Sequence, residues 1–388
     1  MRRKSPLVLF LVSEDWYFLS HRLPMARAAR DAGFEVHVAT RVSGGGERIA
    51  SEGFTLHPLD WRRGSLNPLD LFGIVRQVRR LYRRLAPDLV HHVALQPSIV
   101  GSLAASGMAF PRLNAMAGLG FGFTSATLKG RVLRPVLGAL LRVLLTRQGA
   151  FVLVQNPDDA AAVASLGVAP ERIFTIPGSG VDTDRLQPLP EPAGPVTAAF
   201  VGRLLDDKGV RPLIEAQARL TDRGEDIRLL IAGDRDPANP ASIDPREIAG
   251  WESRPGVTLL GHVDDIAGIW SRAHIAVLPS RREGLPLSLL EAAACGRAIV
   301  ATDVPGCSEI ARPGVNALLV PADDAAALAE AIATLAHDPR LRQRFAAAGR
   351  SMVEREFSSA EIGRQIVAVY DRLLGRAAAL LPPAVRPG

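Results

Sequence analysis

Short runs of apolar residues without polar alternation constrain this chain more than any other feature. Residues 7–12 read Leu-Val-Leu-Phe-Leu-Val, and residues 150–154 and 298–301 are also apolar throughout. A strand that is apolar on both sides is buried on both faces, as in a parallel sheet covered by helices. Segments of helical length separate these runs, so the sequence predicts an α/β fold built on parallel sheets.

The pattern of strands and helices occurs twice. In the first half, strands are expected at 7–12, 35–40, 89–92, 112–117, 150–155 and 173–176, and helices at 21–33, 69–85, 98–106, 131–146 and 157–166. In the second half, strands are expected at 197–201, 228–232, 257–260, 273–278, 298–301 and 317–320, and helices at 209–223, 286–295, 325–338, 339–356 and 357–374. We therefore expect two doubly wound domains facing across a cleft, with a ligand at the carboxyl ends of their strands.

A proline-rich segment separates the two halves at residues 188–195. Such a segment interrupts regular structure and favours a linker. We expect residues 1–187 to form the N-terminal domain and residues 196–357 the C-terminal domain. A helix at 358–378 is a candidate to cross back onto the first domain, and residues 379–388 are expected to be a loose tail.

Composition excludes several classes of protein. Of the 388 residues 47% are hydrophobic, which is ample for buried cores, and two cysteines, Cys295 and Cys307, exclude a disulfide scaffold. Eight histidines show no metal-ligand spacing. No apolar run reaches the ~18 residues of a transmembrane helix. Polar residues at 13–15, in place of a small-residue cleavage site, make 7–12 a strand and not a signal peptide. We expect a cytoplasmic protein.

Charge is distributed unevenly between the halves. Residues 1–180 hold 22 Lys and Arg against 12 Asp and Glu, whereas residues 181–388 hold 24 against 28. This asymmetry indicates that the first half meets an anionic surface, either nucleic acid or an anionic membrane leaflet. Nucleic acid is the weaker interpretation, because no aromatic residues are interleaved with the arginines and no nucleic-acid-binding motif occurs.

The strongest chemical signal joins a strand end to a helix in the second half. It reads Ser280-Arg281-Arg282-Glu283-Gly284-Leu285-Pro286-Leu287-Ser288-Leu289-Leu290-Glu291. Pro286 suits a first helical turn, whose free N–H groups attract an anion. Carboxylates on either side, Glu283 and Glu291, can accept hydrogen bonds from sugar hydroxyls, so the segment suits a sugar nucleotide. The same spacing also fits a helix-start carboxylate and a solvent-facing helix residue.

A second signal follows the first strand of the second half. Arg203 and Lys208 come after Gly202 at the carboxyl end of that strand, where two cations could hold a diphosphate and stabilise a leaving group without metal. Alternatively, these cations pair with Asp206 and Asp207. A metal interpretation rests on the triplets Asp234-Arg235-Asp236 and Asp182-Thr183-Asp184, which have a spacing that also arises by chance. We expect no metal and no cofactor.

Together these motifs resemble the retaining glycosyltransferases of family 4. The resemblance is carried by Gly202-Arg203 with Lys208-Gly209, by Glu283 eight positions before Glu291, and by Ala301-Thr302-Asp303-Val304-Pro305-Gly306. The N-terminal stretch at 13–24 is similar to a bacterial subgroup that builds capsule, O-antigen and lipid-linked oligosaccharides. The family has the GT-B architecture of two Rossmann-like domains, and the resemblance extends over about residues 7–370.

The resemblance implies roles for individual residues. Arg203 and Lys208 would bind the donor diphosphate, Glu283 would contact the donor sugar, and Glu291 would bind the ribose. The remaining donor-binding candidates lie in loops around the diphosphate, the sugar and the base; they are Gly202, Gly233, Asp234, His262, Val263, Gly284, Leu285, Pro286, Leu287 and Ser288. In this family retention is ascribed to front-face attack, in which the leaving diphosphate helps to deprotonate the acceptor, so no dedicated nucleophile is named.

The first half departs from the family pattern at two places. A Gly-Gly loop is replaced by Ser13-Glu14-Asp15-Trp16, and a histidine before the Gly-Leu-Gly segment that starts at Gly118 is replaced by Ala117. Candidates for the acceptor site or reaction centre are Trp16, in a loop facing the cleft, His21, His92 and Gly118. A structural or surface role is an alternative for each histidine.

Two predicted helices in the first half carry clustered arginines. One has Arg76, Arg79, Arg80, Arg83 and Arg84, which recur at three and four positions and so share a face. The other, with Pro135 in its first turn, has Arg131, Arg134 and Arg142 beside an apolar face. Both fit binding to anionic lipid head groups or a polyprenyl diphosphate. Both also fit ordinary helices whose arginines face solvent.

The prediction from sequence is a cytoplasmic, metal-independent glycosyltransferase peripherally associated with the inner membrane. It would move a sugar with retention from a nucleotide-sugar donor, with UDP favoured, to a lipid-linked or surface-polysaccharide precursor. The alternatives are a sugar-nucleotide epimerase on the same fold and a degenerate protein that binds a sugar nucleotide without turnover.

Overall fold

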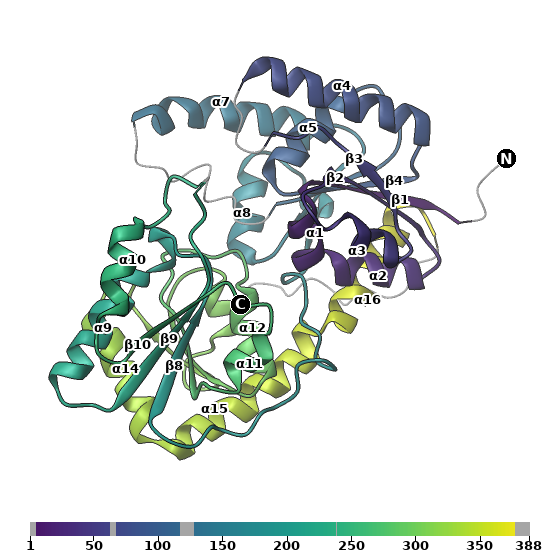
Figure 1. The fold of residues 1–388 in the computed structure, drawn as a ribbon. Helices are drawn as coiled ribbons and strands as arrows, with labels where there is room; N and C mark the ends of the chain where they lie inside the picture. The colour runs from purple at the N-terminus through teal and green to yellow at the C-terminus, as the bar shows by residue number, and fades with distance from the viewer. Residues whose placement is uncertain (1–4, 63–66, 117–127, 238, 377–388) are drawn as a thin grey trace. The chain divides into compact units, whose positions relative to one another are not determined.

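The computed structural model describes residues 5–62, 67–116, 128–237 and 239–376, with the backbone alone for 128–134 (Figure 1). The chain divides into two compact units. The first holds residues 1–179 and 359–388, and the second holds residues 180–358.

The first unit is built on a seven-stranded sheet with the order β3-β2-β1-β4-β5-β6-β7. All its neighbouring strands pair in parallel. The strands are β1 (Leu7–Glu14), β2 (Glu35–Arg41), β3 (Thr55–Pro58), β4 (Leu89–Val93), β5 (Arg112–Ala115), β6 (Ala150–Val154) and β7 (Ile173–Thr175).

Helices cover both faces of this sheet. They are α1 (Asp15–His21), α2 (Leu23–Asp31), α3 (Gly46–Ser51), α4 (Pro68–Leu85), α5 (Leu95–Ala104), α7 (Leu128–Leu145), α8 (Pro157–Ser165), the short η1 (Pro170–Arg172) and α16 (Ser359–Leu373). Alternate residues of β1 face opposite sides: Val8 and Phe10 pack with Ile366 of α16, whereas Leu9 packs with Val78 of α4. This double burial is the reason that β1 is apolar throughout.

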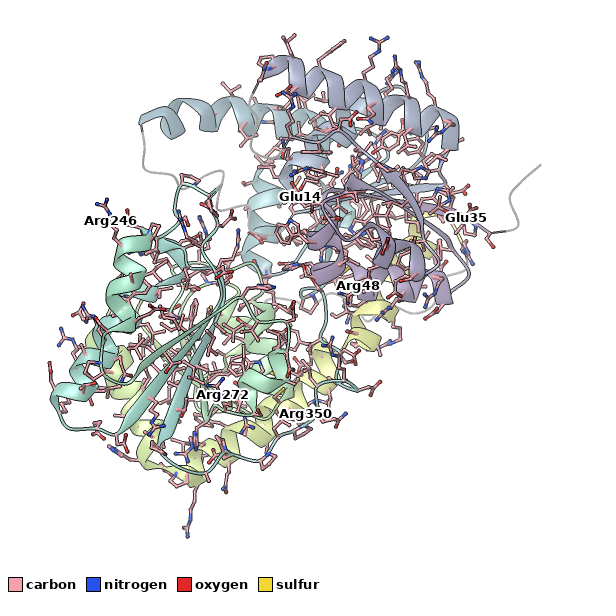
Figure 2. All side chains as sticks on the ribbon, in the orientation of Figure 1. Glu14, Glu35, Arg48, Arg246, Arg272 and Arg350 are labelled. Atoms are coloured by element: carbon pink, nitrogen blue, oxygen red, sulfur yellow. The ribbon has the colours of Figure 1, made fainter. Side chains whose placement is uncertain are left out.

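The second unit has a six-stranded parallel sheet with the order β10-β9-β8-β11-β12-β13. Its strands are β8 (Val196–Val201), β9 (Ile227–Ala232), β10 (Val257–Gly261), β11 (Ile275–Leu278), β12 (Ala298–Thr302) and β13 (Ala317–Val320). Its helices are η2 (Asp206–Lys208), α9 (Val210–Asp222), α10 (Pro245–Glu252), α11 (Ile266–Trp270), α12 (Leu287–Ala294), α13 (Cys307–Ile310), α14 (Ala325–His337), α15 (Pro339–Met352) and η3 (Val353–Phe357). Both cysteines are buried as free thiols. Charged residues such as Arg246 of α10 and Arg272 are exposed on this unit's surface (Figure 2).

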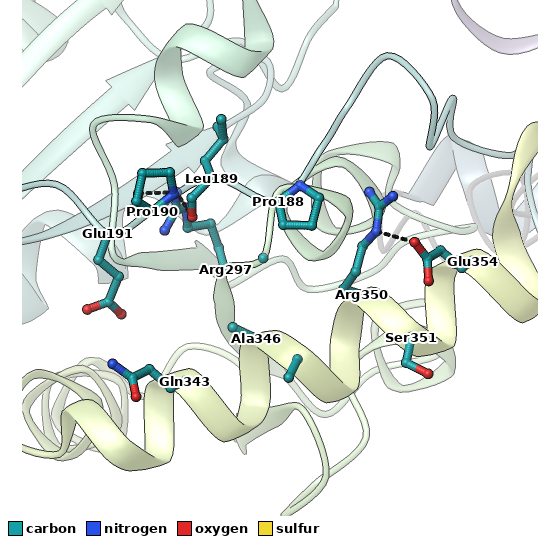
Figure 3. A pocket seen from close by; sticks show the side chains of 12 residues that line it. Pro188, Leu189, Pro190, Glu191, Arg297, Gln343, Ala346, Arg350, Ser351 and Glu354 are labelled. Carbon is teal, nitrogen blue, oxygen red and sulfur yellow. Dashed lines mark hydrogen bonds and ion pairs between the residues drawn. The ribbon is translucent and has the colours of Figure 1, made fainter.

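The proline-rich segment at 188–195, expected to be a linker, lies inside the second unit. The buried guanidinium of Arg297 donates from Nη2 to the carbonyls of Leu189 and Pro190, each at 2.9 Å. Arg342 of α15 pairs with Glu191 through two bonds of 2.9 Å. These contacts fix the segment beside a cavity of about 580 Å³ against α15 (Figure 3). The chain passes between the units earlier, at 179–180, and returns at 358–359. The expected tail at 379–388 lies outside the described residues.

Two further expectations are corrected at helix starts. The segment around Trp16, expected as a loop, is helix α1. Its first residue, Asp15, is acidic and is stabilised by the positive end of the helix dipole. Helix α7 begins at Leu128, so Pro135 lies in its interior and not in its first turn. The proline has no N–H, so the helix passes through it with one backbone hydrogen bond fewer.

Candidate active site

The carboxyl ends of β8 and β11 bring two predicted site residues together. Lys208 Nζ lies 2.6 Å from Oε1 of Glu283, and the hydroxyl of Ser280 donates to the same oxygen at 2.7 Å. The side chains of Lys208 and Glu283 are 20% and 8% exposed. A pair shielded from water in this way interacts more strongly than a surface pair.

Glycines permit this close approach of backbone to backbone. A Cβ atom on Gly209 would lie 1.9 Å from the carbonyl oxygen of Pro279, and one on Gly306 would lie 2.6 Å from that of Glu283. Both glycines have positive φ, 69° and 85°. A side chain at either position would therefore clash as well as strain the backbone, which explains glycine in both motifs.

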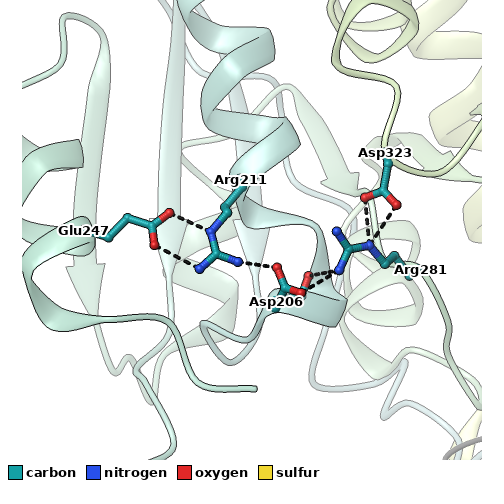
Figure 4. A network of polar contacts seen from close by, with 5 residues as sticks. All are labelled: Asp206, Arg211, Glu247, Arg281 and Asp323. Carbon is teal, nitrogen blue, oxygen red and sulfur yellow. Dashed lines mark hydrogen bonds and ion pairs between the residues drawn. The ribbon is translucent and has the colours of Figure 1, made fainter. Parts of the chain in front are cut away.

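Five charged side chains near Lys208 and Glu283 in the sequence or in the fold form a chain of ion pairs; Figure 4 shows them as Glu247, Arg211, Asp206, Arg281 and Asp323. Glu247 binds Arg211 Nε at 2.7 Å, Arg211 binds Asp206, and Asp206 Oδ2 binds Arg281 Nη1 at 2.7 Å. Arg281 Nε then binds both oxygens of Asp323 at 2.8 Å. The hydrogen bonds to Asp323 and Asp206 raise the pKa of Arg281. Although partial burial opposes the effect, the two arginines lower the pKa of Asp206.

This network connects the loop after β8 to the loop after β11. The N–H of Arg281 donates to the carbonyl of Asp207 at 2.9 Å, next to the Arg281–Asp206 ion pair. Asp207 immediately precedes Lys208, and Arg281 stands two residues before Glu283. Arg281 and Asp206 therefore position the two loops that carry the pair. The sequence offered no signal for this contact beyond opposite charges in two separate motifs.

Helix α12 begins beside Glu283. Pro286 is its N-cap residue, and no side chain of the described residues caps the helix, so the first-turn N–H groups at Leu287 and Ser288 can meet an anion. Gly284 and Leu285 form the approach to this turn. Further along the helix, burial raises the pKa of Glu291 to about 8 against the attraction of Arg185. At neutral pH the Glu291 carboxyl is therefore largely a neutral acid, able to donate a hydrogen bond as well as accept one.

The other candidates of the second unit lie at the ends of β8, β9 and β10. Gly202 and Gly233 touch through their backbones, since a Cβ on Gly233 would lie 1.9 Å from the Gly202 oxygen. Gly233 and Asp234 line a cavity of about 240 Å³. His262 is exposed, 3.3 Å from Asp264, and Val263 is half-buried.

Arg203 is held by an acidic neighbour. Its Nη1 lies 2.8 Å from Asp236 Oδ2, which is the second carboxylate of the Asp234-Arg235-Asp236 triplet. That carboxylate is thus engaged by a cation. Among the described residues, no group of three or more His, Cys, Asp or Glu side chains is arranged to hold a metal ion.

Family models match both units. The model described as "Glycosyl transferases group 1" matches residues 195–338, and the model described as "Glycosyl transferase 4-like" matches residues 7–156. The first match contains Lys208, Glu283 and Glu291, and the second contains the sheet strands β1 to β6.

Curated relatives agree with these models. The chain is 26% identical to the N,N'-diacetylbacillosaminyl-diphospho-undecaprenol alpha-1,3-N-acetylgalactosaminyltransferase of Campylobacter jejuni, over 92% of this chain and 98% of that protein. It is 31% identical to the capsular polysaccharide biosynthesis glycosyltransferase CapM of Staphylococcus aureus, over 45% of this chain and 46% of that protein. The chain belongs to glycosyltransferase family 4.

Solved structures place this glycosyltransferase in the GT-B fold. Sucrose-phosphate synthase from Thermosynechococcus elongatus superimposes with a TM-score of 0.81 and 22% identity, covering 95% of this chain and 99% of that one. HepE of Anabaena, in complex with UDP and glucose, superimposes with a TM-score of 0.75 and 18% identity, covering 94% of this chain and 99% of that one. The predicted architecture of two parallel-sheet α/β domains is confirmed.

The first unit of the glycosyltransferase carries the acceptor-side candidates on α1. The buried carboxylate of Asp15 accepts the N–H groups of Ser43 and Gly45, both at 2.7 Å. Although burial opposes the effect, these bonds lower the pKa of Asp15. They hold the glycine-rich segment after β2 against α1. Trp16 is 42% exposed, and the ring of His21 stacks on Tyr17 with centroids 4.3 Å apart.

The side chain of His92 is buried in the interior of the same unit. Its Nδ1 lies 2.8 Å from Asn114 Oδ1, its Nε2 lies 2.9 Å from the Tyr82 hydroxyl, and the residue is fully buried. Burial lowers its pKa to about 4. With both ring nitrogens bonded inside the unit, His92 is not retained as a reaction-centre candidate. Gly118 lies outside the described residues.

The arginines of α4 do not form one equivalent set. Arg79 donates from Nη1 to the carbonyls of Ala104 and Ser106, each at 2.8 Å, and so ties α4 to the end of α5. The other four arginines of the helix are exposed; they are Arg76, Arg80, Arg83 and Arg84. On α7, Arg142 is exposed, whereas the side chains of Arg131 and Arg134 lie outside the described residues.

Proposed function

We propose that this glycosyltransferase moves a sugar with retention from a UDP-sugar to a lipid-linked or surface-polysaccharide precursor. The observation that carries the proposal is the Lys208–Glu283 pair at 2.6 Å beside the uncapped start of α12. The pair offers a cation and a carboxylate within reach of one ligand, and the helix start adds N–H donors. A diphosphate and its sugar require this combination of groups.

Each residue then has a role toward the donor. Lys208 and Arg203 bind the diphosphate, and the N–H groups from Gly284 to Ser288 bind phosphate or sugar oxygens. Glu283 accepts hydrogen bonds from the sugar hydroxyls. Glu291, as a largely neutral acid, both donates to and accepts from the ribose hydroxyls.

The reaction is a front-face substitution at the anomeric carbon. The bond from that carbon to the diphosphate oxygen breaks, and a bond to the acceptor oxygen forms on the same face. The acceptor proton passes to the leaving diphosphate, whose negative charge Lys208 and Arg203 stabilise. This scheme uses no protein nucleophile and no metal.

The relatives support the choice of donor and acceptor. For the donor, the structure of HepE of Anabaena contains UDP. For the acceptor, the name of the Campylobacter jejuni relative includes a polyprenyl diphosphate. The exposed arginines of α4, without Arg79, and Arg142 of α7 support association with an anionic inner-membrane leaflet on its cytoplasmic side. Leu69 and Phe72, which are 77% and 66% exposed in the first turns of α4, add an apolar contribution. Among the described residues, no helix has both the length and the apolar character to span a bilayer.

Calorimetric titration with UDP, GDP and ADP, with and without magnesium, tests the donor site. The proposal predicts preference for UDP without magnesium. Binding only in the presence of magnesium would make Asp234 and Asp236 the central residues and would refute the metal-free scheme. If none of the three nucleotides binds, the result would favour the alternative that the protein does not turn over a donor.

A further inference from the structure

The first unit contains a small cavity whose lining residues are distant in sequence from the donor-site residues. It has a volume of about 310 Å³ and is formed by the edge strand β3, the residue after it, and helix α4. Its lining residues are His57, Pro58, Leu59, Gln77, Arg80, Leu81 and Arg84. Two of them are cations, and no carboxylate is among them.

The cavity contains two arginines that have no partner within the described residues. Arg80 and Arg84 are four residues apart on α4, so their side chains leave the same side of the helix. Neither side chain forms an ion pair or a hydrogen bond with another residue in the described part of the chain. Like charges at this spacing destabilise a helix slightly, and a bound anion would reverse the effect. Arg79, by contrast, is engaged by the end of α5.

Gln77 supplies a further donor. Its Oε1 accepts the N–H of Asp60 at 3.1 Å, which fixes the side-chain amide. The amide NH2 group, which can only donate, has no acceptor in the described part of the chain. Gln77 and Arg80 are three residues apart and Arg84 is seven residues from Gln77, so all three lie on one face of α4.

His57 completes the lining as a neutral ring. Its Nε2 lies 3.0 Å from Nδ1 of His37, whose Nε2 lies 2.8 Å from Glu35 Oε1. Donation from His37 to the Glu35 carboxylate leaves Nδ1 of His37 as the acceptor for His57. Burial lowers the pKa of His57 to about 4, and the nearby charge of Arg84 adds to the effect. The positive charge of the cavity at neutral pH therefore comes from Arg80 and Arg84.

We propose that this cavity binds a phosphate group through Arg80, Arg84 and Gln77. Two guanidinium groups and an amide provide the charge-assisted donors that phosphate oxygens accept. The phosphate is either free in solution or the head-group phosphate of a lipid. The site belongs to a different unit from Lys208 and Glu283, so the proposal does not rest on sugar transfer. If the lipid is the source, the cavity defines where the proposed membrane association takes place.

Titration with inorganic phosphate tests the cavity itself. Histidine-labelled protein reports phosphate at this site through the NMR signals of the His57 ring, separately from any phosphate bound in the second unit. We expect saturable shifts in the wild type. The double variant R80Q/R84Q should bind about tenfold more weakly, the loss expected for one charge-assisted bond or more. The matched control R76Q/R83Q removes two charges of the same helix outside the cavity and should keep the wild-type affinity.

Vesicles of phosphatidylcholine with phosphatidylglycerol identify the source of the phosphate. A greater loss of sedimentation in R80Q/R84Q than in R76Q/R83Q identifies a lipid head group. Equal sedimentation of the two variants, together with lost phosphate binding in R80Q/R84Q alone, identifies free phosphate. The proposal is overturned if phosphate leaves the His57 signals unchanged, or if both double variants lose affinity equally. UDP binding, measured on the same samples, reports the donor site and confirms that each variant is folded.

Discussion

Lys208 Nζ and Glu283 Oε1 are 2.6 Å apart, although 75 residues separate them in the sequence. The contact exists because β8 and β11 are neighbours in the sheet and each strand ends in a loop that bears one partner. Glycines at 209 and 306 allow those loops to approach. The pair therefore depends on the fold, and through it two motifs become one site.

Replacing Lys208 and Glu283 should separate donor binding from transfer. Lys208→Ala removes the cation proposed to hold the diphosphate, so UDP affinity should fall together with transfer. Glu283→Gln keeps the shape but weakens contacts to the sugar, so UDP affinity should remain while the transfer rate falls about 10²-fold or more. Calorimetry with UDP and steady-state assays measure the two effects. Glu215→Gln, on the outer side of α9, is the control and should change neither. Normal transfer in both site variants would remove these residues from the reaction.

Arg281 should act as a positioning residue. Arg281→Gln breaks the ion pairs to Asp206 and Asp323, so the two loops lose their connection. We expect kcat to fall several-fold with a smaller change in KM. The free energy of unfolding should change by less than about 1 kcal/mol, because the pairs are half-exposed. Arg219→Gln removes a surface pair with Glu215 and should leave kcat unchanged. An Arg281 variant with wild-type kcat would show that the network has no part in holding the site.

Glu291 should make stability fall as pH rises. Its pKa of about 8 in the folded protein lies above the ordinary value of 4.5. Between these two values the unfolded chain releases a proton that the folded protein keeps, so the free energy of unfolding decreases with rising pH. Glu291→Gln removes this contribution, and the variant should lose less stability than the wild type between pH 5 and pH 8. Urea denaturation at both pH values provides the comparison. Parallel pH profiles of variant and wild type would mean that Glu291 is ionised in the folded state.

Arg79 should be structural, unlike its neighbours on α4. Arg79→Ala leaves the carbonyls of Ala104 and Ser106 without their donor, and should lower the free energy of unfolding by about 1–3 kcal/mol. Arg76→Ala and Arg83→Ala remove exposed side chains and should have effects within about 0.5 kcal/mol. Chemical denaturation of the three variants measures the difference. Equal stabilities would indicate that the contact from α4 to α5 contributes nothing.

The strands were the most predictable part of the fold. Continuous apolar runs located β1, β6 and β12 to within two residues at each end, because double burial removes polar residues from such strands. The short elements β3, α3, α10, α11 and α13 were not predicted. Segments of four to eight residues show too little periodicity.

The site was predictable as motifs and not as contacts. Glu283 and Lys208 were found from their own segments, whereas Ser280, Arg281 and Asp206 owe their importance to partners on other strands. Tertiary bonds also decided the first unit. Asp15, at the start of a helix in a segment predicted to be a loop, binds residues after β2. His92 is held in the interior by Asn114 of the neighbouring strand. The local sequence around Asp15 and His92 reveals neither contact.

Acceptor-dependent turnover tests the central claim most directly. Purified protein is incubated with a panel of UDP-sugars, with and without a polyprenyl-diphosphate-linked acceptor, and released UDP and sugar products are quantified. The proposed function predicts UDP release and sugar transfer only with acceptor, beyond slow hydrolysis, and loss of both in Lys208→Ala and Glu283→Gln. Conversion of a donor sugar without acceptor would indicate an epimerase. UDP binding without turnover of any donor would contradict a catalytic role for the pair.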